Sequence, residues 1–91
     1  MSEVTVREKL AKCFRAVFPT LSDASIPGAS VATVGAWDSL AAITLLYVVE
    51  EEFQTAVDLD RLAELNSFES LAEYLLAASR SRIYGRDSAS P

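Results

Sequence analysis

The sequence predicts an all-α fold, a bundle of three long helices and one short helix formed as a single domain over residues 1–79. Apolar residues recur at the three- and four-residue spacing of one helix face. No stretch alternates between apolar and polar residues for long enough to predict a strand. The chain has 91 residues, of which 51% are apolar and 23% charged, so it has material for one modest core and not for two.

The first helix is expected over residues 3–18. One apolar stripe runs along it and just past its end, made by Val6, Leu10, Cys13, Phe14, Val17 and Leu21. Pro19 ends the helix, because the residue before a proline disfavours the α-helical conformation. Residues 19–38 then form a long loop, which we expect to be held against the core by its own apolar side chains: Leu21, Ile26, Val31, Val34 and Trp37.

The second helix is expected over residues 39–53, with Asp38 as its N-cap, because no proline or glycine interrupts this stretch. Its first eleven residues, Ser39–Val49, carry no charge. The residues predicted to face the core are Leu40, Ile43, Leu46 and Val49, with Tyr47 and Phe53 packing at the flank and at the end.

A short helix is predicted over residues 59–64, capped by Asp58, and a last helix over residues 68–78, capped by Ser67. Residue 70 is a serine where a capping box has Glu or Gln, so no capping box is expected at this start. The last helix is predicted to turn Phe68, Leu71, Leu75 and Tyr74 inward.

Charge is unevenly distributed along the chain. The net charge is −5, but residues 19–79 alone carry −9, whereas residues 1–18 and residues 80–91 each carry +2. An acidic domain attracts basic protein surfaces and repels nucleic acid and anionic lipid, so neither nucleic acid nor a membrane is an expected partner. Residues 80–91 are expected to form a flexible, basic tail.

The chain has no histidine, which excludes a Ser-His-Asp triad, a Cys-His pair and any histidine-ligated metal site within it. We therefore expect no enzyme activity and no bound metal. Cys13 is the only cysteine and is predicted to be a buried apolar residue. Without a signal-peptide pattern or an apolar run long enough for a bilayer, a cytoplasmic location is predicted.

The residues that carry chemistry lie where the long loop meets the second helix. Ser39 follows Asp38 in the first turn, where free backbone N–H groups and the positive end of the helix favour an attached phosphate. Considered alone, both residues also fit a purely structural role at a helix cap.

The order of motifs resembles the acyl carrier protein family of phosphopantetheine-binding carrier proteins, in its discrete, stand-alone type. The family's modification motif stands here as Asp38-Ser39-Leu40, and its acidic run before a phenylalanine as Glu50-Glu51-Glu52-Phe53. Val57-Asp58-Leu59-Asp60 matches the family's link into a short third helix. The match runs without gaps from about Trp37 to Leu75, including Leu71 and Tyr74 of the fourth helix, and more loosely from Val4.

This resemblance implies a carrier that is not itself an enzyme. A phosphopantetheinyl transferase would move 4′-phosphopantetheine from coenzyme A onto Ser39, and the new thiol would hold an acyl or aminoacyl group as a thioester. A loading enzyme and downstream synthases or transferases would then act on that group. Family partners meet the second helix with basic patches, which makes Asp38, Leu40, Glu50, Glu51 and Glu52 the predicted partner-recognition residues. The three glutamates alone also fit a solvated surface.

The sequence departs from the carriers of fatty-acid synthesis in having Ala41, Ala42 and Thr44 where those carriers have acidic residues. It also lacks the Gly-Gly-His-Ser pattern of peptidyl carrier domains. The sequence therefore predicts a role in fatty acid, polyketide or other specialised biosynthesis. The alternative is an unmodified, carrier-like helical adaptor that acts only through protein–protein binding. Either protein is expected to be a monomer.

Overall fold

The computed structural model describes the backbone of residues 2–89 and the side chains of residues 2–78. It contains three α-helices, α1 (Glu3–Val17), α2 (Ser39–Phe53) and α3 (Phe68–Ala89), and two 3-10 helices, η1 (Ile26–Gly28) and η2 (Leu59–Arg61). Within this described part there is no strand, only an isolated antiparallel bridge between Ser30 and Ser67. The all-α prediction is thus confirmed, with three α-helices in place of four.

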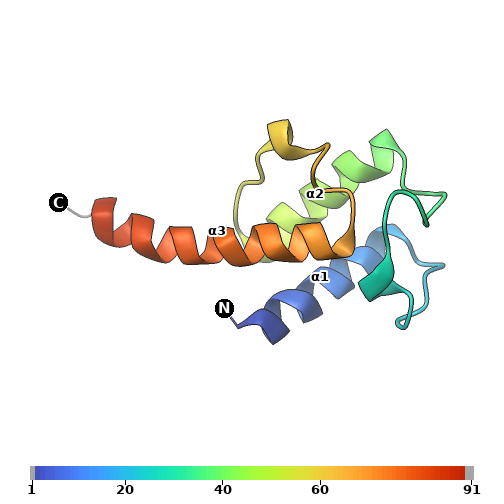
Figure 1. The fold of residues 1–91 in the computed structure, drawn as a ribbon, viewed down its shortest axis with the longest axis horizontal. Coiled ribbons are helices and arrows are strands. Elements are labelled where there is room, and N and C mark those ends of the chain that lie inside the picture. Colours follow the sequence, from blue (N-terminus) through green and yellow to red (C-terminus); the bar gives the residue numbers. More distant parts are fainter. Residues whose placement is uncertain (1, 90–91) are drawn as a thin grey trace.

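The helices pack with α1 against both α2 and α3 (Figure 1). At the centre of the core, Phe14 of α1 lies 5.3 Å from the rings of both Trp37 and Phe68, measured between ring centroids. Phe18 packs on the same group, 5.6 Å from Trp37. These four aromatic side chains join α1, the end of the long loop and the start of α3, and each is 3% exposed or less.

The predicted core stripe of α2 is correct only in part. Leu46 and Val49 are buried, together with Leu45 and Phe53, but Leu40 and Ile43 are exposed to solvent. The reason is that this helix is apolar on more than one face, so two stripes with helical spacing compete for the core. The predictions for α1 and α3 hold for Val6, Leu10, Cys13, Phe14, Phe68, Leu71 and Leu75, which are buried. Val17, Leu21 and Tyr74, also predicted to face inward, are only half-buried against the core.

The predicted short helix over residues 59–64 is one turn of 3-10 helix, Leu59–Arg61, followed by turns. Its backbone bonds join residues three apart, from Leu62 N to Leu59 O at 3.1 Å and from Glu64 N to Arg61 O at 2.9 Å. A segment this short forms too few hydrogen bonds to offset the unfavourable free energy of nucleating an α-helix. None of the three η2 residues is buried, so packing does not add to its stability.

The last helix begins at Phe68 as predicted but continues beyond residue 78 to Ala89. At its start, Ser70 N donates to Ser67 Oγ at 3.0 Å and Ser67 N donates to Ser70 Oγ at 3.1 Å. This reciprocal pair acts as a capping box with serine in the place of glutamate, an arrangement that the sequence prediction missed. Flexibility of residues 80–91 stays a prediction, and residues 90–91 lie outside the described residues.

The long loop is held in place by its own buried side chains and by backbone hydrogen bonds to the start of α3. Ile26 of η1, Val34 and Trp37 are buried as predicted, whereas Val31 is 47% exposed. Backbone bonds tie the loop to the start of α3, from Val31 N to Asn66 O and from Phe68 N to Ala29 O, each 2.9 Å long. The loop therefore reaches Asp38 along a fixed path, which sets the position of the first turn of α2.

Cys13 is buried at 2% exposure on α1, as predicted. Its burial, followed by the nearby carboxylate of Glu52, raises the pKa of the thiol to about 11. Because the thiolate is the reactive form of cysteine, this raised pKa lowers the reactivity of Cys13 at neutral pH.

An ion pair between Arg7 and Glu69 joins α1 to α3. The guanidinium donates two hydrogen bonds to the carboxylate, at 2.6 and 3.0 Å, and a third to Glu3 at 3.0 Å. The hydrogen bonds from Arg7 hold the pKa of Glu69 below its usual value of 4.5. The pair therefore contributes stability above about pH 4.5, and this contribution is lost as the pH falls through the lower pKa of the folded state.

We expect Glu69→Gln to lower the free energy of unfolding at pH 7 by about 1 kcal/mol or less, because both side chains are partly exposed. Below about pH 4.5 the difference from the wild type should shrink, since Glu69 then becomes protonated in the wild type as well. Urea unfolding of both proteins at several pH values measures this. A difference that stays constant down to about pH 2 would contradict a role for the Glu69 charge.

Candidate functional site

Ser39 is the first residue of α2, directly after the loop. Asp38 is the N-cap, as predicted, and its Oδ1 accepts a hydrogen bond from Ala41 N at 2.9 Å. The carbonyl of Asp38 accepts a further bond from Ala42 N at 2.8 Å. Both Asp38 and Ser39 are exposed, while Trp37 just before them is 3% exposed. A buried anchor and a capped helix thus fix the backbone of Ser39 and leave its side chain at the surface.

The backbone N–H groups at the start of α2 favour a negatively charged group beside Ser39, whereas the nearby carboxylates of Asp38 and Asp60 oppose one. In the described part of the chain, the Ser39 hydroxyl takes part in no hydrogen bond, and the N–H groups of Ser39 and Leu40 have no acceptor. Unpaired N–H groups at the first turn carry the positive end of the helix dipole, which stabilises a phosphate held nearby. A phosphate ester on the Ser39 oxygen would lie at this end of α2.

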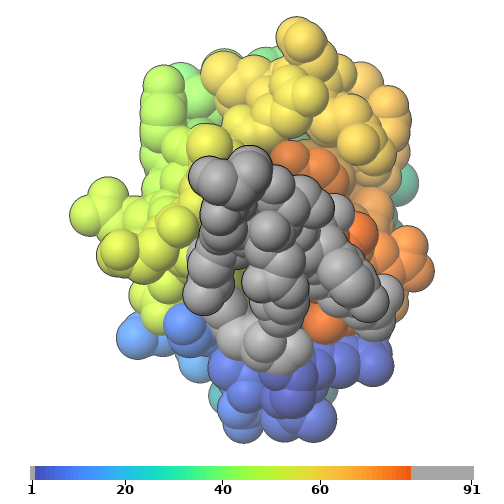
Figure 2. All heavy atoms as spheres, turned by 90° about the vertical axis from the view of Figure 1, so that its left-hand side faces the viewer, coloured from blue at the N-terminus to red at the C-terminus, as the bar shows by residue number. Residues whose placement is uncertain are grey.

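A groove of about 740 Å³ opens beside Ser39, and we call it the Ser39 groove. One wall comes from the loop and α2, and the other from the 58–66 segment that contains η2. The lining residues are Val31, Trp37, Asp38, Ser39, Ala42, Leu59, Asp60, Leu62, Ala63 and Asn66. Figure 2 shows the 58–66 segment, in gold, at the surface between the yellow-green end of α2 and the orange α3. The apolar side chains of the groove fit a nonpolar stretch of a group attached at Ser39.

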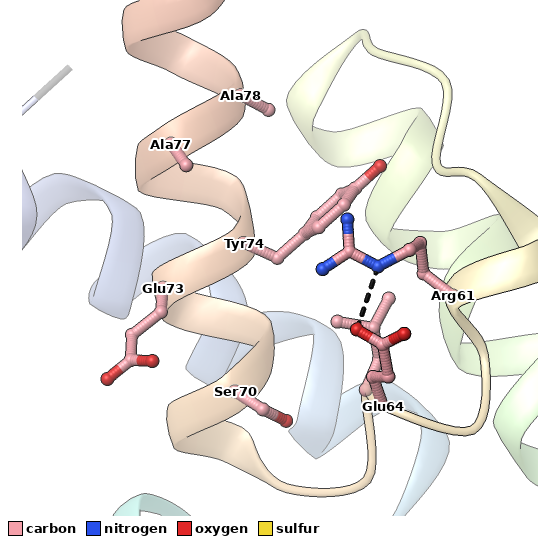
Figure 3. Close-up of a pocket in the computed structure, with 8 residues that line it drawn as sticks. Arg61, Glu64, Ser70, Glu73, Tyr74, Ala77 and Ala78 are labelled. Atoms are coloured by element: carbon pink, nitrogen blue, oxygen red, sulfur yellow. Dashed lines mark hydrogen bonds and ion pairs between the residues drawn. The ribbon is translucent and has the colours of Figure 1, made fainter.

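A second hollow, of about 550 Å³, lies on the other side of the 58–66 segment, against α3, and does not include Ser39 (Figure 3). There the Arg61 guanidinium lies 5.5 Å from the centre of the Tyr74 ring and donates to Glu64 at 2.9 Å. The Tyr74 hydroxyl accepts a hydrogen bond from Asp58 N at 3.1 Å. These contacts attach the 58–66 segment to α3. A structural role therefore accounts for the residues that line this hollow.

The three glutamates predicted to recognise partners lie at the far end of α2, about 16 Å along the helix from Ser39 to Glu50. Glu50 accepts a hydrogen bond from Val57 N at 2.7 Å, and Glu52 lies 3.7 Å from Lys12 Nζ. Glu51 is exposed, and its side chain forms no ion pair or hydrogen bond within the described part of the protein. Of these three glutamates, Glu51 alone is exposed and has a carboxylate without an ion-pair or hydrogen-bond partner among the described residues.

The contact of Glu50 predicts a structural role for that residue. Removing its carboxylate in Glu50→Ala should leave the N–H of the buried Val57 unsatisfied and lower the free energy of unfolding by about 1–2 kcal/mol. Glu51→Ala is the matched control and should change it by less than about 0.5 kcal/mol. Denaturant unfolding of the two variants makes the comparison. Equal effects would contradict the role assigned to Glu50.

The sequence interpretation missed two exposed apolar residues near the site. Ile43 and Tyr47, expected to pack inward or at the flank, are 36% and 61% exposed, and Leu40 is 74% exposed. The available signal was the uncharged Ser39–Val49 stretch, which has more apolar residues than one buried face of a helix holds.

No helix among the described residues is both long enough and apolar enough to cross a membrane. Nor do three or more potential metal-ligating side chains come together anywhere in that part of the chain.

Comparison with known proteins gives one result. A family model described as phosphopantetheine attachment site matches residues 8–75, about three-quarters of the chain. No match is found among the curated proteins or among the solved structures. The matched span contains the loop, Ser39 and most of the helical bundle, and it confirms the resemblance to acyl carrier proteins. The chain therefore belongs to the phosphopantetheine attachment site family, whose members carry covalently attached 4′-phosphopantetheine.

Proposed function

We propose that Ser39 is the residue to which 4′-phosphopantetheine is attached and that the chain carries acyl or aminoacyl groups between biosynthetic enzymes. The observation that carries this proposal is the Ser39 hydroxyl itself. It is exposed at the start of α2, has no internal hydrogen-bond partner among the described residues and lies within the span matched by the family. When bound, the prosthetic group would supply a thiol that holds the cargo as a thioester.

Attachment requires a base that takes the proton of the Ser39 hydroxyl. The Ser39 oxygen would form a bond to the phosphorus that carries pantetheine, and the pyrophosphate bond of coenzyme A would break with release of adenosine 3′,5′-bisphosphate. The hydroxyl proton must go to an acceptor, and the chain has no histidine to take it. We therefore assign the base to a separate phosphopantetheinyl transferase.

After attachment, the chain's own residues would bind and position the group. The free N–H groups of Ser39 and Leu40 would face the phosphate and favour its negative charge. Ala42, Leu59, Leu62 and Ala63 would offer an apolar wall beside it. In this account the protein supplies position and recognition, acts as a carrier and performs no catalysis of its own.

The partners follow from this proposal: the transferase, a loading enzyme, and the synthases or transferases that use the cargo. Asp38 and Leu40 border the attachment point and stay proposed recognition residues, as do Glu50, Glu51 and Glu52, of which Glu51 is best placed for that role. The proposed pathways are fatty acid, polyketide or other specialised biosynthesis. The cytoplasmic location and the monomeric state likewise stay predictions from the sequence.

The test is intact mass after incubation with coenzyme A and a broad-specificity phosphopantetheinyl transferase. The carrier proposal predicts a gain of one phosphopantetheinyl group per chain. The alternative, an adaptor that works only through binding, predicts no gain in a folded sample with any of several transferases. The same experiment thus separates the two functions.

A further inference from the structure

Among the described side chains, the indole Nε1 of Trp37 is a buried polar atom without a hydrogen-bond partner. The side chain is 3% exposed and packs on the rings of Phe14 and Phe18, at 5.3 and 5.6 Å between ring centroids. A buried indole N–H ordinarily has an acceptor, because burial removes the water that would otherwise accept its hydrogen bond. Packing therefore accounts for the ring of Trp37 but not for its N–H.

Trp37 lies beside the proposed attachment point. It comes two residues before Ser39, so the Cα atoms of the two residues are at most about 7.6 Å apart. Both residues line the Ser39 groove, together with the apolar side chains of Val31, Ala42, Leu59, Leu62 and Ala63. A residue with an unpaired donor thus borders the groove that is open to a group attached at Ser39.

We propose that the Trp37 N–H binds the 4′-phosphopantetheine arm by donating a hydrogen bond to the first amide carbonyl beyond the phosphate. This inference rests on the proposed function, since it takes Ser39 as the attachment residue. A neutral carbonyl suits a buried donor better than the phosphate does, because burial of a charged group costs far more free energy than burial of an amide. The carboxylates of Asp38 and Asp60 line the same groove and disfavour a further negative charge inside it.

The wall of the groove that contains η2 can give the arm access to the buried donor. None of the three η2 residues, Leu59–Arg61, is buried, so an outward shift of this wall disturbs little core packing. The side of the indole that packs on Phe14 and Phe18 would stay in place during such a shift. The phosphate would remain at the exposed start of α2, and the arm would extend from there along the apolar lining of the groove.

The proposed hydrogen bond can be observed directly, because the single tryptophan gives one indole signal in a proton–nitrogen NMR spectrum. Attachment of the unlabelled arm from coenzyme A to the isotope-labelled protein should move this signal downfield and slow its exchange with solvent about fivefold. Filtered NOEs should connect the indole proton with carbon-bound protons of the arm. Ser39→Ala, incubated in the same way, is the matched control and should keep the signal of the unmodified protein.

Trp37→Phe tests whether the N–H matters beyond the packing of the ring, since it removes the donor and keeps an aromatic side chain against Phe14 and Phe18. Attachment should raise the urea midpoint of the wild type, and this rise should be largely lost in Trp37→Phe, because the hydrogen bond forms only after attachment. A purely structural Trp37 would instead leave the rise unchanged in the variant, which overturns the proposal. If the variant does not fold, the NMR comparison on the wild type decides.

Four NMR and mass outcomes would each overturn a defined part of the proposal. A gain in mass with an unmoved indole signal overturns this inference alone. A signal that lies upfield both before and after attachment would show that the N–H faces the ring of Phe14 or Phe18, which also overturns it. A downfield shift without NOEs to the arm would place the phosphate at the donor and overturn the amide carbonyl as acceptor. A wild-type protein that gains no mass overturns the proposed function and, with it, the role of Trp37.

Discussion

Ser39→Ala is expected to abolish phosphopantetheinylation while leaving the fold intact. The variant lacks the only atom that the account assigns as the acceptor, so the mass gain should fall below detection even at high transferase concentration. The free energy of unfolding should change by less than about 0.5 kcal/mol, because Ser39 is exposed and the helix cap is supplied by Asp38. Intact mass and urea unfolding, measured on the same preparation, check both parts of this expectation.

A second serine variant controls for general effects on the loop. Ser25→Ala removes an exposed hydroxyl that contacts Ser22 Oγ at 2.9 Å, away from α2. It should be modified at the wild-type rate. If the Ser39→Ala variant were still modified, or if only the Ser25→Ala variant lost modification, the attachment point would be a residue other than Ser39.

The largest loss of stability is expected from Phe14→Ala. Phe14 is fully buried and contacts Phe18, Trp37 and Phe68, so its removal leaves a cavity where α1, the loop and α3 meet. Truncation of a buried phenylalanine typically costs about 3–5 kcal/mol, which is a large share of the total for a domain of this size. Urea unfolding measures the change directly.

The single tryptophan gives this variant a second readout. Trp37 packs edge-on against Phe14 at 5.3 Å, so its fluorescence should respond when that ring is lost. Phe14→Leu keeps most of the volume and should lose much less stability than Phe14→Ala. A loss below about 1 kcal/mol in Phe14→Ala would contradict the central position assigned to this aromatic group.

The sequence predicted the bounds of the first two helices and the position of Ser39 well because both depend on local signals. Pro19 ends the first helix near the predicted residue, and Asp38 caps the second through its own carboxylate. Trp37 is buried as the loop's apolar pattern predicted, and it anchors the turn that presents Ser39. The two helix ends are decided within a few residues of the chain, and the burial of Trp37 follows from its packing on Phe14 and Phe18.

The features that the sequence could not decide depend on contacts between distant residues. Which face of α2 is buried follows from the packing of Leu45, Leu46 and Val49 against the bundle, and periodicity alone does not choose between two apolar faces. Asp58 caps η2 locally as predicted, but the 58–66 segment is attached to α3 through the Tyr74 hydroxyl, which accepts a hydrogen bond from Asp58 N. The hydrogen bond of Glu50 with Val57 N and the ion pair of Glu52 with Lys12 likewise form only when the chain folds.

The measurement that tests the central claim most directly is localisation of the group on the wild-type protein after reaction with coenzyme A and the transferase. Trypsin would release residues 16–61 as one peptide with four serines, at positions 22, 25, 30 and 39, so fragmentation of that peptide must identify the modified one. The buried thiol of Cys13 lies outside this peptide and does not compete. We predict a single phosphopantetheinyl group on Ser39. An unmodified peptide, or a group on any other serine, would contradict the account.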